Sequence, residues 1–140
     1  MKGATRPTRS GEIVRNWHLI DLKGKILGRA AGDIAAKLIG KSKPYFVPNL
    51  DCGDYVIVVN ATGVEVTGKK ESQKEYHHFS GYPGGLKRKP YHRVMQEKPE
   101  RIIQEAVSGM LPKNKLRDSM LTRLYVYPGS EHPYKAKLTK

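Results

Sequence analysis

The sequence has little of what disulfide-stabilised and membrane-spanning proteins need. Its 140 residues include a single cysteine, Cys52, so no disulfide can form within the chain, and we expect a reducing compartment. No stretch approaches the roughly 20 consecutive apolar residues that a membrane-spanning helix requires, and the mean hydropathy is −0.60. Residues 1–16 lack the apolar segment of a secretory signal peptide. These absences predict a soluble protein that is located in the cytoplasm.

Acidic residues are scarce relative to basic ones. The chain has 26 lysines and arginines against 13 aspartates and glutamates, which gives a formal net charge of +13 and a pI of about 9.9. A compact chain with this charge repels itself unless a polyanion neutralises it. Nucleic acid is the commonest such partner, and an anionic membrane surface is the next. The charge therefore favours binding to nucleic acid over the alternative of a basic enzyme.

Hydrophobic spacing along the chain predicts one α/β domain. Apolar residues at three- and four-residue intervals predict helices over residues 27–39, from Pro99 to the stop at Pro112, and from residue 116 to Leu124. Strands are expected at residues 17–21, 64–66 and 125–127, and the continuous β-branched run at 55–59 predicts a central strand covered on both faces. We expect this domain to span residues 17–140. The basic N-terminal arm before it, residues 1–16, has nothing to bury, and we expect it to be mobile or ordered by a partner.

Motifs for nucleotide or metal binding are incomplete. Residues 63–69 fit the first part of a phosphate-binding loop, but Lys70 stands where a serine or threonine would hold magnesium. The intervening residues favour a strand rather than a compact loop. His77 and His78 are adjacent rather than four residues apart, so a helix would not present both to one metal ion. We therefore expect no cofactor, no metal site and no small-molecule substrate.

The remaining reactive side chains also suit structural roles. Cys52 lacks the sequence surroundings of a catalytic cysteine, and a lone cysteine is usually a small buried side chain. Asp51 and Asp54 flank a glycine in a loop, which is typical of turn-forming or capping residues. We expect the protein not to be an enzyme.

One segment, residues 69–93, combines basic and aromatic side chains with glycine and proline, and we expect a long loop that buries little. Lysine and arginine neutralise phosphates, aromatic rings stack on unpaired bases, and glycine lets a backbone approach a sugar–phosphate chain closely. Two other short segments are also basic. The candidate RNA-binding residues are Lys41, Lys43, Lys69, Lys70, His78, Ser80, Tyr82, Lys87, Arg88, Lys113, Asn114 and Lys115.

Six groups of residues, in the same order and spacing, resemble the large-subunit ribosomal protein L13 family. They are Trp17-His18-x-Ile20-Asp21 with Leu27-Gly28-Arg29, residues 55–61, residues 67–70, residues 80–85, residues 109–114, and residues 126–133. The resemblance implies a three-layer α/β/α domain around a four-stranded, mainly parallel sheet with long basic loops. It also implies contacts with rRNA at Lys69, Lys70, residues 80–87, Lys113 and Asn114.

The function that the resemblance implies is structural. The protein is expected to bind large-subunit rRNA early in assembly, to stabilise the folded rRNA, and to contact neighbouring ribosomal proteins. A basic RNA-binding regulator that acts outside the ribosome is the alternative, and the sequence does not separate a bacterial from an organellar ribosome. A membrane-surface protein would need a basic amphipathic helix with bulky apolar anchors, whereas residues 27–39 and 99–110 carry mixed charge and moderate apolar faces.

Overall fold

A three-stranded parallel sheet is the centre of the protein. The computed structural model describes residues 6–138. The sheet contains β1 (Trp17–Asp21), β2 (Tyr55–Val59) and β5 (Leu124–Val126), in the order β1-β2-β5. Four of the five residues of the central strand β2 are buried, in agreement with its continuous β-branched sequence.

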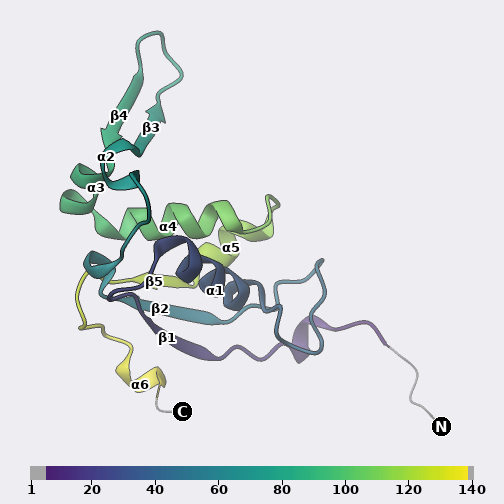
Figure 1. Ribbon diagram of the computed structural model, residues 1–140. Coiled ribbons are helices and arrows are strands. Elements are labelled where there is room, and N and C mark those ends of the chain that lie inside the picture. The colour runs from purple at the N-terminus through teal and green to yellow at the C-terminus, as the bar shows by residue number, and fades with distance from the viewer. Residues whose placement is uncertain (1–5, 139–140) are drawn as a thin grey trace.

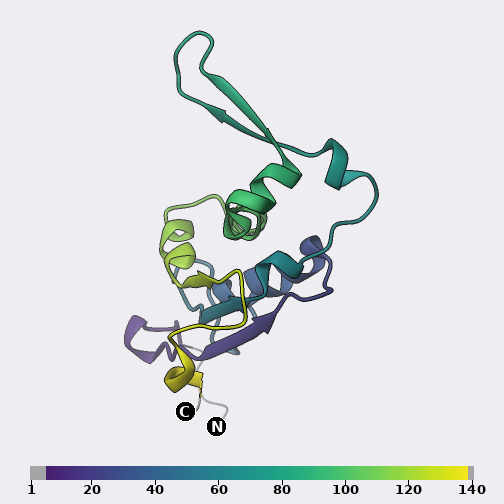
Figure 2. The ribbon, with the colours of Figure 1, turned by 90° about the vertical axis from the view of Figure 1, so that its left-hand side faces the viewer.

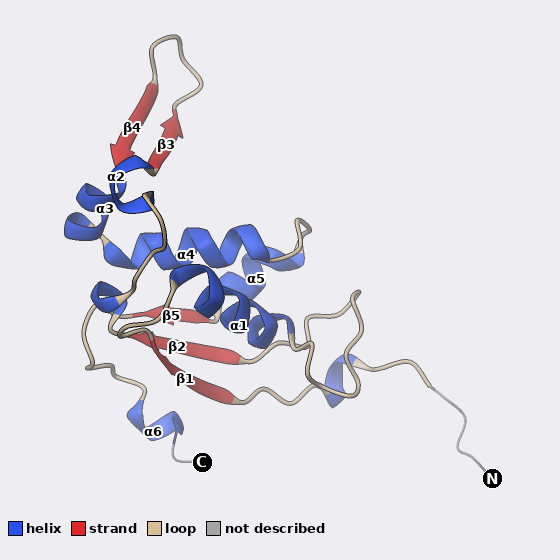
Figure 3. Ribbon diagram, viewed as in Figure 1, coloured by secondary structure: helices blue, strands red, loops and turns tan. Residues whose placement is uncertain are grey.

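Three helices cover one face of this sheet (Figures 1 and 3). They are α1 (Leu27–Ile39), α4 (Pro99–Met110) and α5 (Leu116–Thr122). The left-handed backbone of Gly40, with φ of 80°, ends α1. Side chains alternate between the faces of a strand, so Val56, Val58 and Leu124 turn toward the helices and join their apolar residues in the core.

The opposite face of the sheet is aromatic. Trp17 lies beside Tyr55 in the strand register, and Tyr125 lies beside Ile57. The C-terminal segment, with the four-residue helix α6 (Lys135–Leu138), passes over this face, and Tyr134 stacks on Trp17 (Figure 2). The C-terminal segment therefore lies on this face in place of a layer of long helices.

A β-hairpin projects from the helical side of the molecule (Figures 1 and 2). Its strands are β3 (Glu75–Phe79) and β4 (Leu86–Pro90), which pair antiparallel. The short helix α2 (Lys70–Gln73) precedes the hairpin, and α3 (Tyr91–Glu97) follows it and leads to α4. Two single turns of 3-10 helix, η1 (Ser10–Glu12) and η2 (Ala61–Gly63), complete the elements.

Part of the expected N-terminal arm lies against the domain. Thr8 donates a hydrogen bond from Oγ1 to the carbonyl oxygen of Tyr45 at 2.7 Å, and the backbone N–H of Asn16 donates to Asp54 at 3.0 Å. Residues 1–5 lie outside the described residues. The domain boundary at residue 16 stays a prediction.

Several predictions from the sequence are confirmed. The chain forms one mixed α/β domain with a parallel sheet. The strands at 17–21 and 55–59 and the helices at 27–39 and 99–110 have the expected bounds. Cys52 is fully buried.

Other predictions are wrong. The sheet has three strands rather than four, because residues 64–66 form no strand: Glu65 makes an isolated bridge with Ile26, and the chain then turns at Gly68, whose φ is 66°. The three-layer arrangement is not confirmed, since the long helices lie on one face. Residues 69–93 are not a loop but α2, the hairpin and the start of α3. The helix from residue 116 ends at Thr122, so Leu124 belongs to β5.

Candidate nucleic-acid interface

The candidate RNA-binding residues separate into two groups at opposite ends of α4 (Figure 1). One group lies on α2 and the hairpin: Lys69, Lys70, His78, Ser80, Tyr82, Lys87 and Arg88. The other group lies in the loops after α1 and α4: Lys41, Lys43, Lys113, Asn114 and Lys115. Because α4 has 12 residues, it is about 18 Å long. The two groups are therefore separate surfaces and not one cluster.

The tip of the hairpin is a compact six-residue turn at residues 80–85. Ser80 donates its backbone N–H to the carbonyl oxygen of Gly85 at 3.3 Å, and Gly85 donates to that of Tyr82 at 2.9 Å. A Cβ at Gly85 would overlap the hydroxyl oxygen of Ser80 and lie 2.9 Å from the carbonyl oxygen of Tyr82, so a larger residue there would displace the Ser80 side chain and press on the turn. Tyr82 in this turn is 76% exposed, and Phe79 at the end of β3 is 62% exposed. Aromatic rings are thus presented to solvent at the point farthest from the sheet.

The base of the hairpin is fixed to the helices by one buried ring and by the ion pair between Lys89 of β4 and Glu97 of α3. Tyr76 is buried, and this burial, followed by the charge of Glu105, raises the pKa of Tyr76 to about 12. Lys89 and Arg93 each donate to the carboxylate of Glu97 at 2.8 Å. These two hydrogen bonds lower the pKa of Glu97 to about 2. The hairpin is therefore anchored at its base, although a two-stranded ribbon alone is marginally stable.

The outer part of the hairpin carries cations without internal partners. His77 lies opposite Arg88 in the register, and His78 lies opposite Lys87. Within residues 6–138, neither Lys87 nor Arg88 makes an ion pair, and both are exposed. Each of these two cations is free to bind an external anion.

A second set of free cations lies beside α2. Lys69, Lys70 and Lys74 line a hollow of about 480 Å³ together with Thr67, Gly68 and Gln73. Among the described residues these three lysines have no carboxylate partner, and Lys74 lies 5.5 Å from the ring centroid of Tyr76. Three ammonium groups around one hollow suit a phosphate group.

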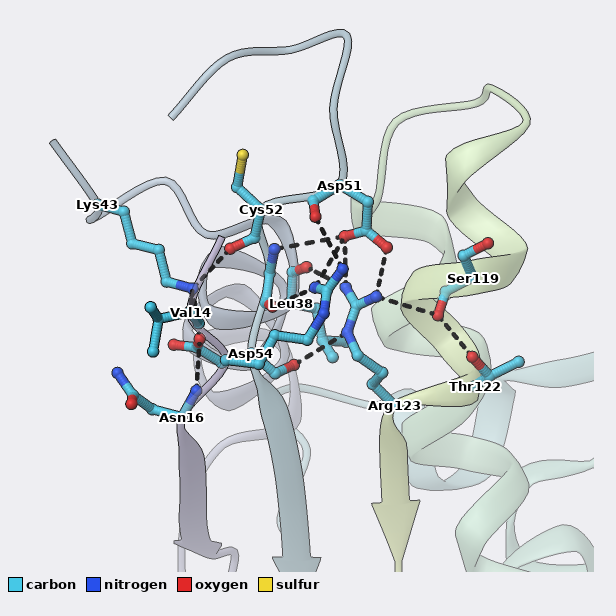
Figure 4. A network of polar contacts seen from close by, with 12 residues as sticks. Val14, Asn16, Leu38, Lys43, Asp51, Cys52, Asp54, Ser119, Thr122 and Arg123 are labelled. Atoms are coloured by element: carbon cyan, nitrogen blue, oxygen red, sulfur yellow. Dashed lines mark hydrogen bonds and ion pairs between the residues drawn. The ribbon is translucent and has the colours of Figure 1, made fainter. Parts of the chain in front are cut away.

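At the other end of α4, Lys43 is used by the fold (Figure 4). Its ammonium group donates to the carbonyl oxygens of Val14 at 2.6 Å and Cys52 at 2.7 Å. The third partner is the carboxylate of Asp54 at 2.6 Å, and the side chain is 10% exposed. An ammonium group has three N–H donors, so all the donors of Lys43 are occupied. The structure does not present Lys43 as a free cation.

A second buried cation, Arg123, lies next to this site (Figure 4). Its guanidinium makes a bidentate ion pair with Asp51, one bond of which is 2.6 Å, and donates to the carbonyl oxygen of Leu38 at 3.0 Å. Burial alone would raise the pKa of Asp51, but the hydrogen bonds from Arg123 hold it below its ordinary value. Burial would likewise raise the pKa of Asp54, but hydrogen bonds, first of all the one from Lys43, lower it below its ordinary value.

Sequence reasoning missed these ion pairs. The predicted turn role of Asp51 is confirmed, because its Oδ1 accepts the backbone N–H of Gly53 at 3.3 Å. Its main partner, Arg123, is 72 residues away in the sequence. No local pattern connects two residues at that separation.

The remaining candidates at this end are exposed. Lys41, Lys113 and Lys115 have exposed side chains. Asn114 instead accepts the backbone N–H of Leu116 with its Oδ1 at 3.1 Å, where α5 begins. Three lysines at this end can therefore contact an anion directly, while the amide of Asn114 is partly used by the fold.

Residues 6–138 contain no group of three or more histidine, cysteine, aspartate or glutamate side chains placed to hold a metal ion. The helices in that range are all too short or too polar to cross a membrane. The geometry consists of free cations and exposed rings on a folded scaffold, which suits an anionic polymer better than a small substrate.

Comparison with known proteins agrees with this geometry. The model of the family described as ribosomal protein L13 matches residues 15–133. The large ribosomal subunit protein uL13 of Solibacter usitatus is 52% identical over 131 residues, which cover 94% of this chain and 91% of the relative. The protein of the same name from Clostridioides difficile is 51% identical over 129 residues, covering 92% and 90%. That from Syntrophotalea carbinolica is 48% identical over 134 residues, covering 96% and 94%.

Proposed function

The chain belongs to the ribosomal protein L13 family, and on this premise we propose that it is a structural constituent of the large ribosomal subunit that binds large-subunit rRNA. The family is one of structural ribosomal proteins and not of enzymes. One observation carries the rRNA-binding part of the proposal: Lys69, Lys70, Lys87 and Arg88 are exposed and have no carboxylate partners among residues 6–138. Such cations repel one another until an external anion neutralises them.

The scaffold determines how these cations meet RNA. Lys69 and Lys70 bind phosphates at the base of the hairpin, and Lys87 and Arg88 bind them along its length. His78, Ser80 and Tyr82 supply a ring, a hydroxyl group and a second ring near the tip for unpaired bases or ribose. The major groove of A-form RNA is too narrow for side chains, so recognition rests on backbone shape and on unpaired bases.

The second group of lysines extends this surface. Lys41, Lys113 and Lys115 lie about one helix length, ~18 Å, from the base of the hairpin. Two RNA segments that bind at the two ends of α4 lose part of their mutual repulsion and are held at a fixed separation. We include early assembly in the proposal, because a projecting hairpin enters between rRNA segments only before these segments pack. Neighbouring ribosomal proteins are the further partners, and the ribosome in the cytoplasm is the location.

Sedimentation tests this function. The tagged protein is expressed in cells, and the lysate is separated on a sucrose gradient in low and in moderate salt. We expect the protein to migrate with large subunits and to remain with them after the moderate-salt wash. Recovery at the top of the gradient in both salts, with large subunits intact, would contradict the proposal.

A further inference from the structure

A second cavity lies far from the hairpin, at the start of β1. Arg15, Asn16, Trp17 and Lys137 line this cavity, which has a volume of about 410 Å³. Trp17 belongs to the aromatic face of the sheet, which the long helices do not cover, and α6 lies beside the start of β1 (Figure 2). The fold places two cations, an amide and an indole around one space.

The indole of Trp17 is held in a fixed orientation. It stacks on Tyr55 with ring centroids 4.3 Å apart and an interplanar angle of 9°. Tyr134 lies 5.3 Å from it, at 27°. The backbone N–H of Lys137 donates to the carbonyl oxygen of Tyr134 at 3.0 Å, so both side chains lie on one side of the same helical turn. The stacking of Tyr134 thus brings Lys137 to the cavity.

The guanidinium of Arg15 is also held in place. It donates to the carbonyl oxygens of Gly53 at 2.6 Å and Asp51 at 3.0 Å, and its side chain is 30% exposed. Guanidinium has five N–H donors, so three remain for another partner. The nearest carboxylate, that of Asp51, is 3.7 Å away, but it is already paired with Arg123. Positive charge therefore remains in excess at this end of the cavity.

The other two lining residues have unused polar groups. Lys137 is exposed, and within residues 6–138 its ammonium group makes no ion pair. The side-chain amide of Asn16 makes no hydrogen bond to the described residues, although its backbone is bonded to Asp54 and Tyr55. The amide can donate and accept at the edge of a base.

We propose that this cavity binds one unpaired nucleotide of an RNA strand. The base packs against the part of the indole that lines the cavity, and the phosphate lies between Arg15 and Lys137. The amide of Asn16 reads the edge of the base. A paired base has its edge occupied and cannot enter, so the site takes single-stranded or looped RNA. This inference rests on the proposed function but uses a surface that shares no residue with the hairpin.

Trp17 is the only tryptophan of the chain, so the tryptophan fluorescence comes from a residue that lines this cavity. The full chain is titrated with a single-stranded oligouridine and, in parallel, with an RNA duplex of the same length. We expect the single strand to quench Trp17 and the duplex to bind without quenching it. Equal quenching by both, or binding of the single strand with no change in emission, would overturn the proposal.

A pair of lysines on α6 separates this site from general charge attraction. Lys137 lines the cavity, whereas Lys135 is exposed on the same short helix and does not line it. We expect Lys137→Ala to weaken binding of the single strand about five-fold and to reduce the log–log salt slope by about 0.7. Lys135→Ala should change the affinity less than about two-fold. Equal effects of the two substitutions would show that the cavity plays no part.

Two controls distinguish the failure of this inference from the failure of the proposed function. A hairpin variant, Lys87→Ala with Arg88→Ala, should weaken binding to large-subunit rRNA while the single strand still quenches Trp17. If this variant binds rRNA more weakly but the single strand does not change the emission of Trp17, the proposed function stands and the inference is overturned. Uridine monophosphate is titrated separately, and quenching equal to that of the oligouridine at the same nucleotide concentration would assign the cavity to free nucleotides instead.

Discussion

The buried Lys43 and Arg123 network and the projecting hairpin use the same residue types for opposite purposes. In the network, each cation has a carboxylate and backbone carbonyl oxygens around it and almost no exposure to solvent. On the hairpin, Lys87 and Arg88 have solvent around them and no carboxylate partner within the described chain. The comparison shows that burial and partners, rather than residue type, decide whether a cation holds this fold or is available to an external anion.

The largest expected difference is in stability, between a charge placed in the central sheet and the same charge placed in the hairpin. Val58 in β2 is fully buried, so Val58→Asp places an unpaired charge in the core and costs at least several kcal/mol, enough to unfold the domain. Phe79→Asp in β3 puts the same charge on a strand residue that is 62% exposed, and it should change stability by less than about 0.5 kcal/mol. Circular dichroism and gel filtration measure both. A folded Val58→Asp variant would show that the core is misassigned.

The next difference concerns two arginines. Arg123→Met leaves the partly buried carboxylate of Asp51 without its main partner and should lower the free energy of unfolding by about 2–3 kcal/mol. Arg88→Met on the hairpin removes the same charge from an exposed position and should change it by less than about 0.5 kcal/mol. Urea unfolding of the two variants tests the contrast. Similar losses in both would mean that the hairpin cations also stabilise the fold.

The stability that the buried network contributes should depend on pH. The folded-state pKa of Asp51 is lowered, so its ion pair contributes stability above the unfolded-state pKa of about 3.9, and this contribution is lost as the pH falls through the folded-state pKa. The stability difference between wild type and Asp51→Asn should therefore be full at pH 6 and should shrink below about pH 4.

The matched control is Asp33→Asn, on the exposed side of α1, where the carboxylate makes no ion pair with residues 6–138. Its difference from wild type should be small at both pH values. A pH-independent difference for Asp51→Asn would contradict the ion pair.

The smallest expected effect is at the base of the hairpin. The pKa of Glu97 is lowered to about 2 by the hydrogen bonds from Lys89 and Arg93, but the group is exposed and solvent screens its interactions. Glu97→Gln should lower stability slightly at low salt and less as salt is added. Thermal unfolding at two ionic strengths measures the loss of stability. A loss as large as that of Arg123→Met, or one that salt does not reduce, would show that this ion pair stabilises the fold as the buried network does.

The fold was predictable where an element buries a regular face. The continuous β-branched run of β2 and the three- and four-residue spacing of α1 gave the correct bounds. The hairpin was missed because only Tyr76 of β3 is buried, so the strand has no alternation of apolar and polar residues. The prediction of a fourth strand was wrong. Val64 and Val66 indicate a strand only if the chain continues beside a partner strand, whereas here the chain turns at Gly68.

The candidate site was predictable to the extent that charge density marks it. Composition pointed to an anionic polymer, and clustering pointed to α2, the hairpin and the loop after α4. Charge density alone could not distinguish Lys41, which is exposed, from Lys43, whose ammonium group is bonded to Val14, Cys52 and Asp54. That distinction depends on contacts between segments that the sequence separates, and only the folded chain brings these together.

The most direct test is the salt dependence of rRNA binding. Lys69, Lys70, Lys87 and Arg88 are replaced together by alanine, and the affinity for large-subunit rRNA is measured over a series of salt concentrations. If these cations neutralise phosphates, the log–log slope falls by roughly one unit for each lost contact, and the free energy of unfolding stays within about 1 kcal/mol of wild type. A slope equal to that of the wild type, in a variant that folds normally, would contradict the assignment of the α2 and hairpin cations to RNA.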